Sequence, residues 1–180
     1  MNVPTILITG TVGVGKSTVA DEIHLTLAEL EIPNVAIDLD ALICQWPPSS
    51  RWNNELMFES LAALWPVYAA HGATHLVLAR VFEDPADLDG YRASVPGAEI
   101  TICRLLAPED TRVERLRRRM PAGPSLDWHL HRTGELEAIL EQLAYENFAV
   151  DNGRRSVRAV AVEILQRAGW ISAQQALSLM

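Results

Sequence analysis

Four residues near the start of the chain, Gly10, Gly15, Lys16 and Ser17, follow the spacing G-x-x-x-x-G-K-S. Glycines in such a loop let the backbone turn tightly and present successive N–H groups to an anion. A lysine at this place reaches the β- and γ-phosphates of a nucleotide, and the hydroxyl that follows it ligates Mg²⁺. The spacing therefore predicts a site for a magnesium nucleotide, with an incidental glycine turn as the alternative.

The flanking sequence supplies the elements that such a loop needs. Residues 3–9 are apolar and β-branched, which is typical of a buried strand. Residues 17–31 carry an apolar stripe at helical spacing, so a helix begins directly after the loop. Its N-terminus adds partial positive charge beside the phosphates. We therefore expect the phosphates to contact Gly10, Thr11, Gly13, Val14, Gly15, Lys16, Ser17 and Thr18.

Composition narrows the class of protein. Lys16 is the only lysine among 15 basic residues, and a bias towards arginine does not explain why the one lysine stands in this loop. A chain of 180 residues favours a single domain covering residues 1–180. The net charge of −8 argues against a nucleic-acid partner.

The same composition bears on location. Cys44 and Cys103 are too few for a disulfide framework and suit a reducing compartment. The apolar runs are too short to span a bilayer, and the first of them reads as a strand rather than a leader. We therefore expect a cytoplasmic protein without a membrane partner, as a monomer or homodimer.

Strand and helix patterns alternate along the whole chain. Further strands are expected at 34–40, 74–82, 98–106 and 148–151. A helix over 53–72 is expected to be kinked or broken at Pro66, and one over 125–147 to be interrupted at Gly134. The last helix, 156–169, has Ser156 as its expected N-cap and Gly169 as its C-cap. Repeated β-α units of this kind predict an α/β fold with a parallel sheet covered on both faces.

Two further pairs of polar residues are spaced for chemistry. Asp38 and Asp40 are two apart on an expected strand, so their side chains would leave the same face at its carboxyl end. Alternatively, Asp40 caps a short helix and Asp38 bonds the loop backbone. Arg115 and Arg119 are i, i+4 neighbours on an expected helix, so they share one of its faces. They could act together at a ligand, or they could simply form a solvated basic helix end.

These features together resemble the P-loop small-molecule and nucleotide kinases of the adenylate kinase-like fold, a group that includes shikimate, adenylylsulfate and gluconate kinases and chloramphenicol phosphotransferase. The resemblance rests on GTVGVGKS at 10–17, DLD at 38–40 and RLRRR at 115–119. It implies a three-layer α/β/α P-loop NTPase fold with a five-stranded parallel sheet in the order 2-3-1-4-5. It also implies an acceptor-binding insertion at about 41–72 and a small helical lid at about 117–134.

The resemblance further implies a reaction, the transfer of the γ-phosphoryl group of Mg-ATP to a hydroxyl of a small molecule. Catalysis would fall to Lys16, to Asp40 as the group that accepts the hydroxyl proton, and to Arg119 at the phosphates. Ser17 and Asp38 would serve Mg²⁺, and Asp38 and Asp40 the acceptor. The base would be bound by Arg115 and by the turn at Asn152 and Gly153, with Arg132 as a further candidate from the lid.

Two departures from the family pattern leave alternatives open. The expected strand 74–82 carries no carboxylate of the Walker B kind, although Glu83 and Asp84 follow it. Arg80 stands near its end and could bind an anionic acceptor or pair with Asp40. The missing carboxylate supports the alternative function, a non-catalytic ATP-binding regulator or sensor. Four aromatic residues could line the acceptor pocket or simply pack under a helix: Trp46, Trp52, Phe58 and Trp65.

Overall fold

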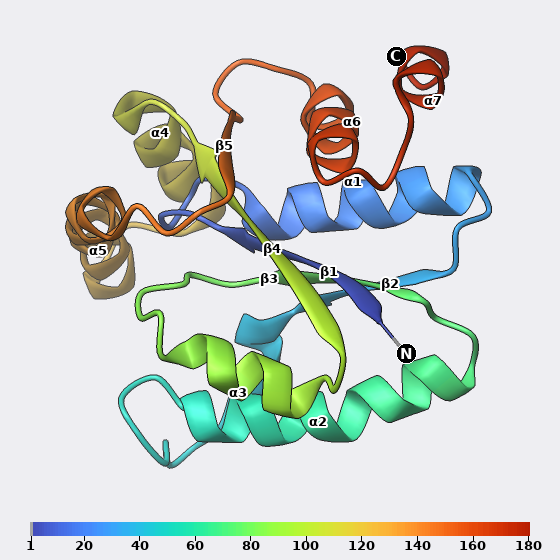
Figure 1. Ribbon diagram of the computed structural model, residues 1–180. Coiled ribbons are helices and arrows are strands. Elements are labelled where there is room, and N and C mark those ends of the chain that lie inside the picture. The colour runs from blue at the N-terminus through green and yellow to red at the C-terminus, as the bar shows by residue number, and fades with distance from the viewer. Residues whose placement is uncertain (1) are drawn as a thin grey trace.

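The computed structural model describes residues 2–180 and contains one parallel five-stranded sheet (Figure 1). The strands are β1 (Val3–Thr9), β2 (Asn34–Asp38), β3 (His75–Ala79), β4 (Ala98–Leu106) and β5 (Phe148–Asp151). They lie in the order β2-β3-β1-β4-β5, so the predicted fold class and strand order are confirmed. This order places β1, and the loop that follows it, at the centre of the sheet.

Helices cover both faces and one end of this sheet (Figure 1). One face is covered by α1 (Lys16–Glu29), α6 (Val157–Arg167) and α7 (Ala173–Ser178), and the other by α2 (Asn54–Ala70) and α3 (Asp87–Ser94). The helices α4 (Glu109–Arg119) and α5 (Pro124–Leu143) stand beyond the carboxyl ends of the strands. The last helix, α7, is an addition to the elements expected from the sequence.

The central strand β1 is buried from both sides, which explains its continuous apolar sequence. Ile6 and Ile8 belong to the core beneath α1 and α6, whereas Leu7 belongs to the core beneath α2 and α3. Because side chains alternate along a strand, each face of β1 contributes to a different core. The two cores hold the end of β1 firmly, and the glycine loop starts from that end.

The expected break at Pro66 and the expected interruption at Gly134 are wrong, while the alternative of a kink at Pro66 stays a prediction. The helix α2 runs through Pro66 to Ala70, and α5 runs through Gly134 to Leu143. Ala62, whose carbonyl loses its partner because proline has no N–H, is exposed, so water can replace that partner. In α5, the buried Leu126, Leu136 and Leu140 outweigh the roughly 1 kcal/mol cost of a helical glycine.

The ends of α6 agree with its expected caps to within one residue. The Ser156 side chain accepts a hydrogen bond from the Ala159 N–H and is the N-cap. The C-cap is Ala168, and Gly169 follows it with a φ of 74°, a left-handed conformation that suits glycine. Within residues 2–180, no helix is both long enough and apolar enough to cross a membrane.

Candidate functional site

The loop between β1 and α1 has the backbone that its glycines predict. Gly10, Gly13 and Gly15 have φ angles of 140°, 80° and 102°, in a region that other residues rarely adopt. A Cβ atom on Gly13 would lie 2.9 Å from the Arg112 carbonyl oxygen. The close packing of α4 against the loop therefore requires glycine there as strictly as the backbone angles do.

Lys16 lies folded across this loop. Its Nζ donates to the carbonyl oxygens of Gly10 at 3.1 Å and Thr11 at 3.0 Å. Burial of the ammonium group lowers the Lys16 pKa to about 8, and the nearby carboxylates of Asp40 and Asp38 oppose that shift. Lys16 is thus a partly desolvated cation, poised close to two carboxylates at the centre of the site.

Ser17 and Asp38 bring two side-chain oxygens together beside Lys16. The Ser17 hydroxyl donates to Asp38 Oδ2 at 2.6 Å. Among residues 2–180, no three His, Cys, Asp or Glu side chains are grouped so as to hold a metal ion by themselves. Mg²⁺ is commonly bound by one or two protein oxygens together with nucleotide phosphates, so this pair fits Mg²⁺ delivered with ATP.

The expectation that Asp38 and Asp40 share one face of a strand is wrong. Strand β2 ends at Asp38, and a 3-10 helix, η1 (Leu39–Ile43), begins directly after it. Asp38 is the N-cap of this helix, because its Oδ1 accepts a hydrogen bond from the Asp40 N–H at 3.0 Å. Asp38 therefore caps the turn that carries Asp40, the reverse of the capping role considered for Asp40.

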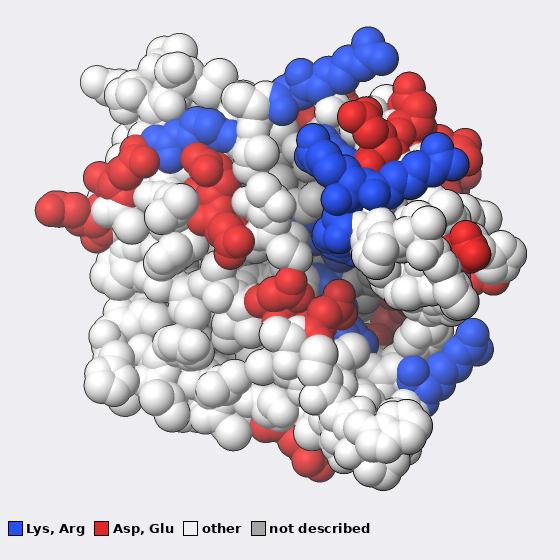
Figure 2. Space-filling view, turned by 180° about the vertical axis from the view of Figure 1, so that it is seen from behind, with Lys and Arg blue, Asp and Glu red and all other residues white. Residues whose placement is uncertain are grey.

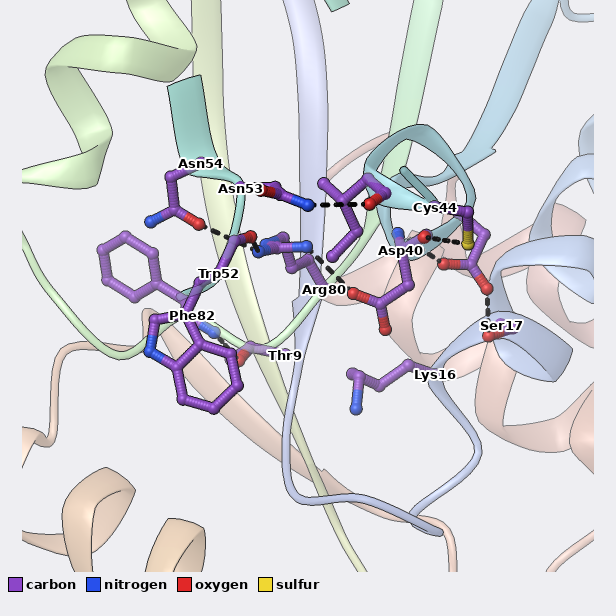
Figure 3. A network of polar contacts seen from close by, with 12 residues as sticks. Thr9, Lys16, Ser17, Asp40, Cys44, Trp52, Asn53, Asn54, Arg80 and Phe82 are labelled. Atoms are coloured by element: carbon purple, nitrogen blue, oxygen red, sulfur yellow. Dashed lines mark hydrogen bonds and ion pairs between the residues drawn. The ribbon is translucent and has the colours of Figure 1, made fainter. Parts of the chain in front are cut away.

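Asp40 and Arg80 form an ion pair at the carboxyl end of the sheet (Figure 3). Arg80 Nη1 lies 2.9 Å from Asp40 Oδ1, and its Nη2 donates to the Trp52 carbonyl at 3.0 Å and to Asn54 Oδ1 at 2.9 Å. The Arg80 side chain is only 9% exposed. Of the two alternatives for Arg80, the structure shows the pairing with Asp40.

One cavity of about 970 Å³ joins the glycine loop to this ion pair. Its lining includes Lys16, Ser17 and Arg119 together with Asp40 and Arg80. Figure 2 shows a hollow on one face of the molecule, with basic side chains gathered along one side and acidic side chains along another. The lining thus combines basic side chains suited to phosphates with a group of residues around the Asp40–Arg80 pair. We call this group the acceptor end of the cavity, and its members are Asp40, Trp52, Asn54, Arg80, Glu83, Asp84, Asp87, Trp128 and Arg132.

The base-binding candidates lie together behind the loop. Arg115 donates to the carbonyl oxygens of Val14 at 3.0 Å, Asn152 at 2.8 Å and Gly153 at 3.2 Å. Asn152, which is buried, donates from Nδ2 to the same Val14 oxygen at 2.7 Å. Arg115 consequently fastens the turn after β5 to the glycine loop, and both Arg115 and Asn152 line the cavity.

The four aromatic candidates separate in the structure. Trp52 lines the cavity, whereas Trp46 is 89% exposed and is not among the lining residues. Trp65 is buried in the core, and Phe58 packs edge-on against Tyr91 with ring centroids 5.1 Å apart. Packing, which was one of the two alternatives, therefore describes Phe58 and Trp65.

Helix α5 brings residues to the cavity from far along the chain. Arg132 Nη2 lies 2.5 Å from Glu83 Oε2, and its guanidinium lies over the Trp52 ring at 4.8 Å from the centroid. Trp128, one turn earlier, also lines the cavity. Neither Trp128 nor Asn54 was expected at the site, because no motif marks them and only the fold brings them there.

Two buried contacts hold α4 and α5 to the glycine loop. Thr133 Oγ1 donates to the Val12 carbonyl at 2.9 Å, and Arg112 Nη1 donates to Thr11 Oγ1 at 3.2 Å. Arg112 also forms an ion pair with Glu137 of α5. The expected lid at about 117–134 therefore includes Thr133, which is bonded to the glycine loop. The role of this region as a lid stays a prediction.

Comparisons with known proteins agree with this geometry. The sequence matches no protein-family model and no curated protein. The structure is similar to a gluconokinase from Sinorhizobium meliloti 1021, at 18% identity over 97% of both chains with a TM-score of 0.60. It is similar to the Deinococcus radiodurans tunicamycin resistance protein, at 22% identity over 93% of this chain and 96% of that one, with a TM-score of 0.63.

A third similar structure is an APS kinase from Mycobacterium tuberculosis, solved in complex with AMPPNP and APS. It shares 21% identity over 92% of this chain and 96% of that chain, with a TM-score of 0.60. At such identities the likeness shows the fold. The predicted resemblance to P-loop small-molecule kinases is therefore confirmed at the level of fold.

Proposed function

We propose that the protein is an ATP-dependent kinase that transfers the γ-phosphoryl group of Mg-ATP to a hydroxyl of a small molecule. The observation that carries the proposal is the single cavity that contains both Lys16 and the carboxylate of Asp40. A phosphate-binding loop alone is compatible with many functions. A carboxylate beyond it, in the same cavity, is the arrangement that phosphoryl transfer to a hydroxyl uses.

Bound Mg-ATP supplies the phosphoryl group and much of the charge neutralisation. The residues of the chain position it: the loop N–H groups and Lys16 hold the phosphates, and Ser17 and Asp38 provide the oxygens that fit Mg²⁺. Arg119 lines the cavity near Lys16 and is placed to stabilise charge on the transferred group. Arg115 and Asn152, which line the cavity, are assigned to the base, whereas Gly153 follows Asn152 in the same turn and is not among the lining residues.

Asp40 is the group assigned to the acceptor hydroxyl. Its Oδ1 is held by Arg80, and in residues 2–180 no hydrogen bond engages its Oδ2. In the reaction, the acceptor oxygen bonds to the γ-phosphorus, the bond between that phosphorus and the β–γ bridging oxygen breaks, and Asp40 takes the hydroxyl proton. Arg80 orients the carboxylate for this role, a positioning contribution rather than direct contact with the phosphates.

A second function is favoured by one observation. Strand β3 ends with Ala79 followed by Arg80, so it supplies no carboxylate to the metal. This is the feature expected of a non-catalytic ATP sensor that keeps its loop. Asp38 of β2 weighs against the sensor, because its contact with Ser17 puts a carboxylate at the expected metal position.

An ADP-release assay across a panel of hydroxylated metabolites and antibiotics separates the two functions. A kinase gives ADP release that depends on one class of acceptor and is lost in Lys16→Ala. A sensor binds ATP in calorimetry but gives no acceptor-dependent turnover with any compound. Absence of ATP binding would contradict both functions.

A further inference from the structure

The two arginines at the acceptor end of the cavity are already neutralised. Arg80 is paired with Asp40 at 2.9 Å, and its remaining bonds go to Trp52 and Asn54. Arg132 lies 2.5 Å from Glu83 and 3.2 Å from Glu135. An anionic acceptor would have to compete with these carboxylates for both guanidinium groups, so neither arginine is free to recognise one.

Two further carboxylates line the same end without a cationic partner. Asp84 and Asp87 border the cavity, and within residues 2–180 neither forms an ion pair. Asp84 Oδ1 accepts only the Ala86 N–H, at 2.9 Å. Asp87 accepts two long contacts from Asn54 Nδ2, each 3.4 Å. At the acceptor end, the carboxylates of Asp40, Glu83, Asp84 and Asp87 therefore outnumber the guanidinium groups of Arg80 and Arg132, and the nearby Lys16 is assigned to the phosphates.

The surroundings of Asp87 make that excess charge unfavourable in the empty cavity. Burial raises the Asp87 pKa, the neighbouring Asp84 and Glu83 add to the shift, and Arg80 and the Asn54 hydrogen bond oppose it. A positively charged group bound beside these carboxylates would relieve the repulsion. An anion there would increase it.

Acidic residues also favour a helix N-terminus, and Asp87 and Asp89 both stand in the first turn of α3. Asp89, however, has a side chain that is 92% exposed, and it lies 3.6 Å from Arg92, outside the cavity. Asp84 and Asp87 differ from Asp89 in facing the cavity. Asp89 is therefore a suitable control, because its carboxylate lies on the same helix but outside the cavity.

We propose that the acceptor is a hydroxylated small molecule bearing a protonated amine, which Asp84 and Asp87 bind while its hydroxyl lies at Asp40. This inference rests on the proposed kinase function for the place of the hydroxyl. The preference for a cation follows separately from the charges that line the cavity. Trp128, which is half exposed at the same end, offers a flat apolar surface to a ring.

The test uses acceptors that differ in charge on one scaffold. Glucosamine, N-acetylglucosamine and glucuronate form one set, and kanamycin with its fully N-acetylated form makes another. Binding is measured by calorimetry with and without a non-hydrolysable ATP analogue, and turnover by ADP release. We expect the amine form of at least one scaffold to exceed its uncharged and anionic forms by about tenfold or more, in affinity or in kcat/KM.

Variants assign that preference to residues. Asp84→Asn combined with Asp87→Asn should reduce amine binding about tenfold and abolish the discrimination, while Asp89→Asn leaves both unchanged. ATP affinity should stay the same in both variants, since none of these residues belongs to the loop that holds the phosphates. Melting curves check that each variant is folded.

The outcomes separate this inference from the proposed function. If amine binding depends on Asp84 and Asp87 but no acceptor is phosphorylated, the inference is supported and the proposed kinase function is contradicted. Turnover of an anionic or N-acetylated probe at least as fast as its amine form overturns the inference while keeping the kinase. The absence of amine binding in both sets, or an amine preference that survives the double substitution, also overturns it.

Discussion

Arg80 and Asp40 meet at 2.9 Å from the segments that follow two neighbouring strands, and this contact sets the direction of the Asp40 carboxylate. Arg80 follows β3, whereas Asp40 lies in the turn after β2, so the pairing of β2 with β3 brings them together. Figure 3 shows Asp40 lying between Arg80 and Lys16. One carboxylate oxygen is held by the arginine, which leaves the other for the acceptor.

Asp40→Asn should reduce kcat by roughly 10²–10⁴, the usual contribution of a positioned acid–base group. A loose transition state asks little of a base, which favours the lower end of this range. Asparagine keeps an oxygen for Arg80, so the melting temperature and ATP affinity should barely change. Steady-state kinetics and calorimetry measure these quantities once the acceptor is known. Wild-type turnover in this variant would move the catalytic role to another carboxylate, with Asp38 first.

Lys16→Ala should lower the rate of transfer about 10²–10³-fold, as for the loss of one donor to a developing charge. The fold should survive, because Lys16 Nζ bonds only two loop carbonyl oxygens. Circular dichroism and ADP release, measured on the same preparation, check both expectations. A fully active Lys16→Ala protein would contradict the assignment of the loop.

ATP affinity should fall as the pH rises above about 8, where the Lys16 ammonium of the free protein loses its proton. Phosphates bind the charged form, so at higher pH binding must be accompanied by proton uptake, and affinity falls by up to about tenfold per pH unit. Calorimetry between pH 7 and 9.5 in buffers of different ionisation enthalpy measures both effects. In Lys16→Ala the same curve should be flat, and a wild-type curve that is equally flat would contradict the lowered pKa.

The stability of the free protein depends on pH in the opposite direction from its ATP affinity. Because the folded pKa of Lys16 lies below its ordinary value of 10.5, its charged form disfavours the folded state of the free protein at low pH. That penalty decreases as the pH rises from about 8 towards 10.5.

Asp38→Asn should weaken ATP binding in the presence of Mg²⁺ and leave binding in EDTA nearly unchanged. Asparagine can still accept the Asp40 N–H, so the cap of the 3-10 helix is kept while the charge beside Ser17 is lost. Titration of ATP with and without the metal isolates that charge. An equal loss under both conditions would mean that Asp38 acts on the loop and not on Mg²⁺.

The sheet could be predicted from the sequence because its strands are strongly apolar. The bounds expected for β1, β4 and β5 are those observed, since each is a hydrophobic run between polar turns. Pro66 and Gly134 were misleading because local preferences for ending a helix are weaker than the packing of a long helix against its neighbours. Alternation along a strand likewise failed for Asp40, because the strand ends at Asp38, two residues before its expected end, and Asp38 caps the 3-10 helix that follows.

The site was only partly predictable for a different reason. The glycine loop is marked by a local motif, so its residues could be identified without a structure. The acceptor end is assembled from β2, β3, α2, α3 and α5, and its pairs join residues as distant as Glu83 and Arg132. Spacing along the chain could propose Arg80 as a partner of Asp40, but it could not choose between that pair and a free arginine.

The presence of a single lysine makes the glycine loop open to a measurement of its own local unfolding. A protease that cleaves only after lysine has one peptide bond to attack, the one between Lys16 and Ser17. That bond lies at the start of α1, where cleavage requires the helix end and the loop to open together. The rate at which the two fragments appear therefore reports the opening of this one turn. Saturating ATP should slow the cleavage.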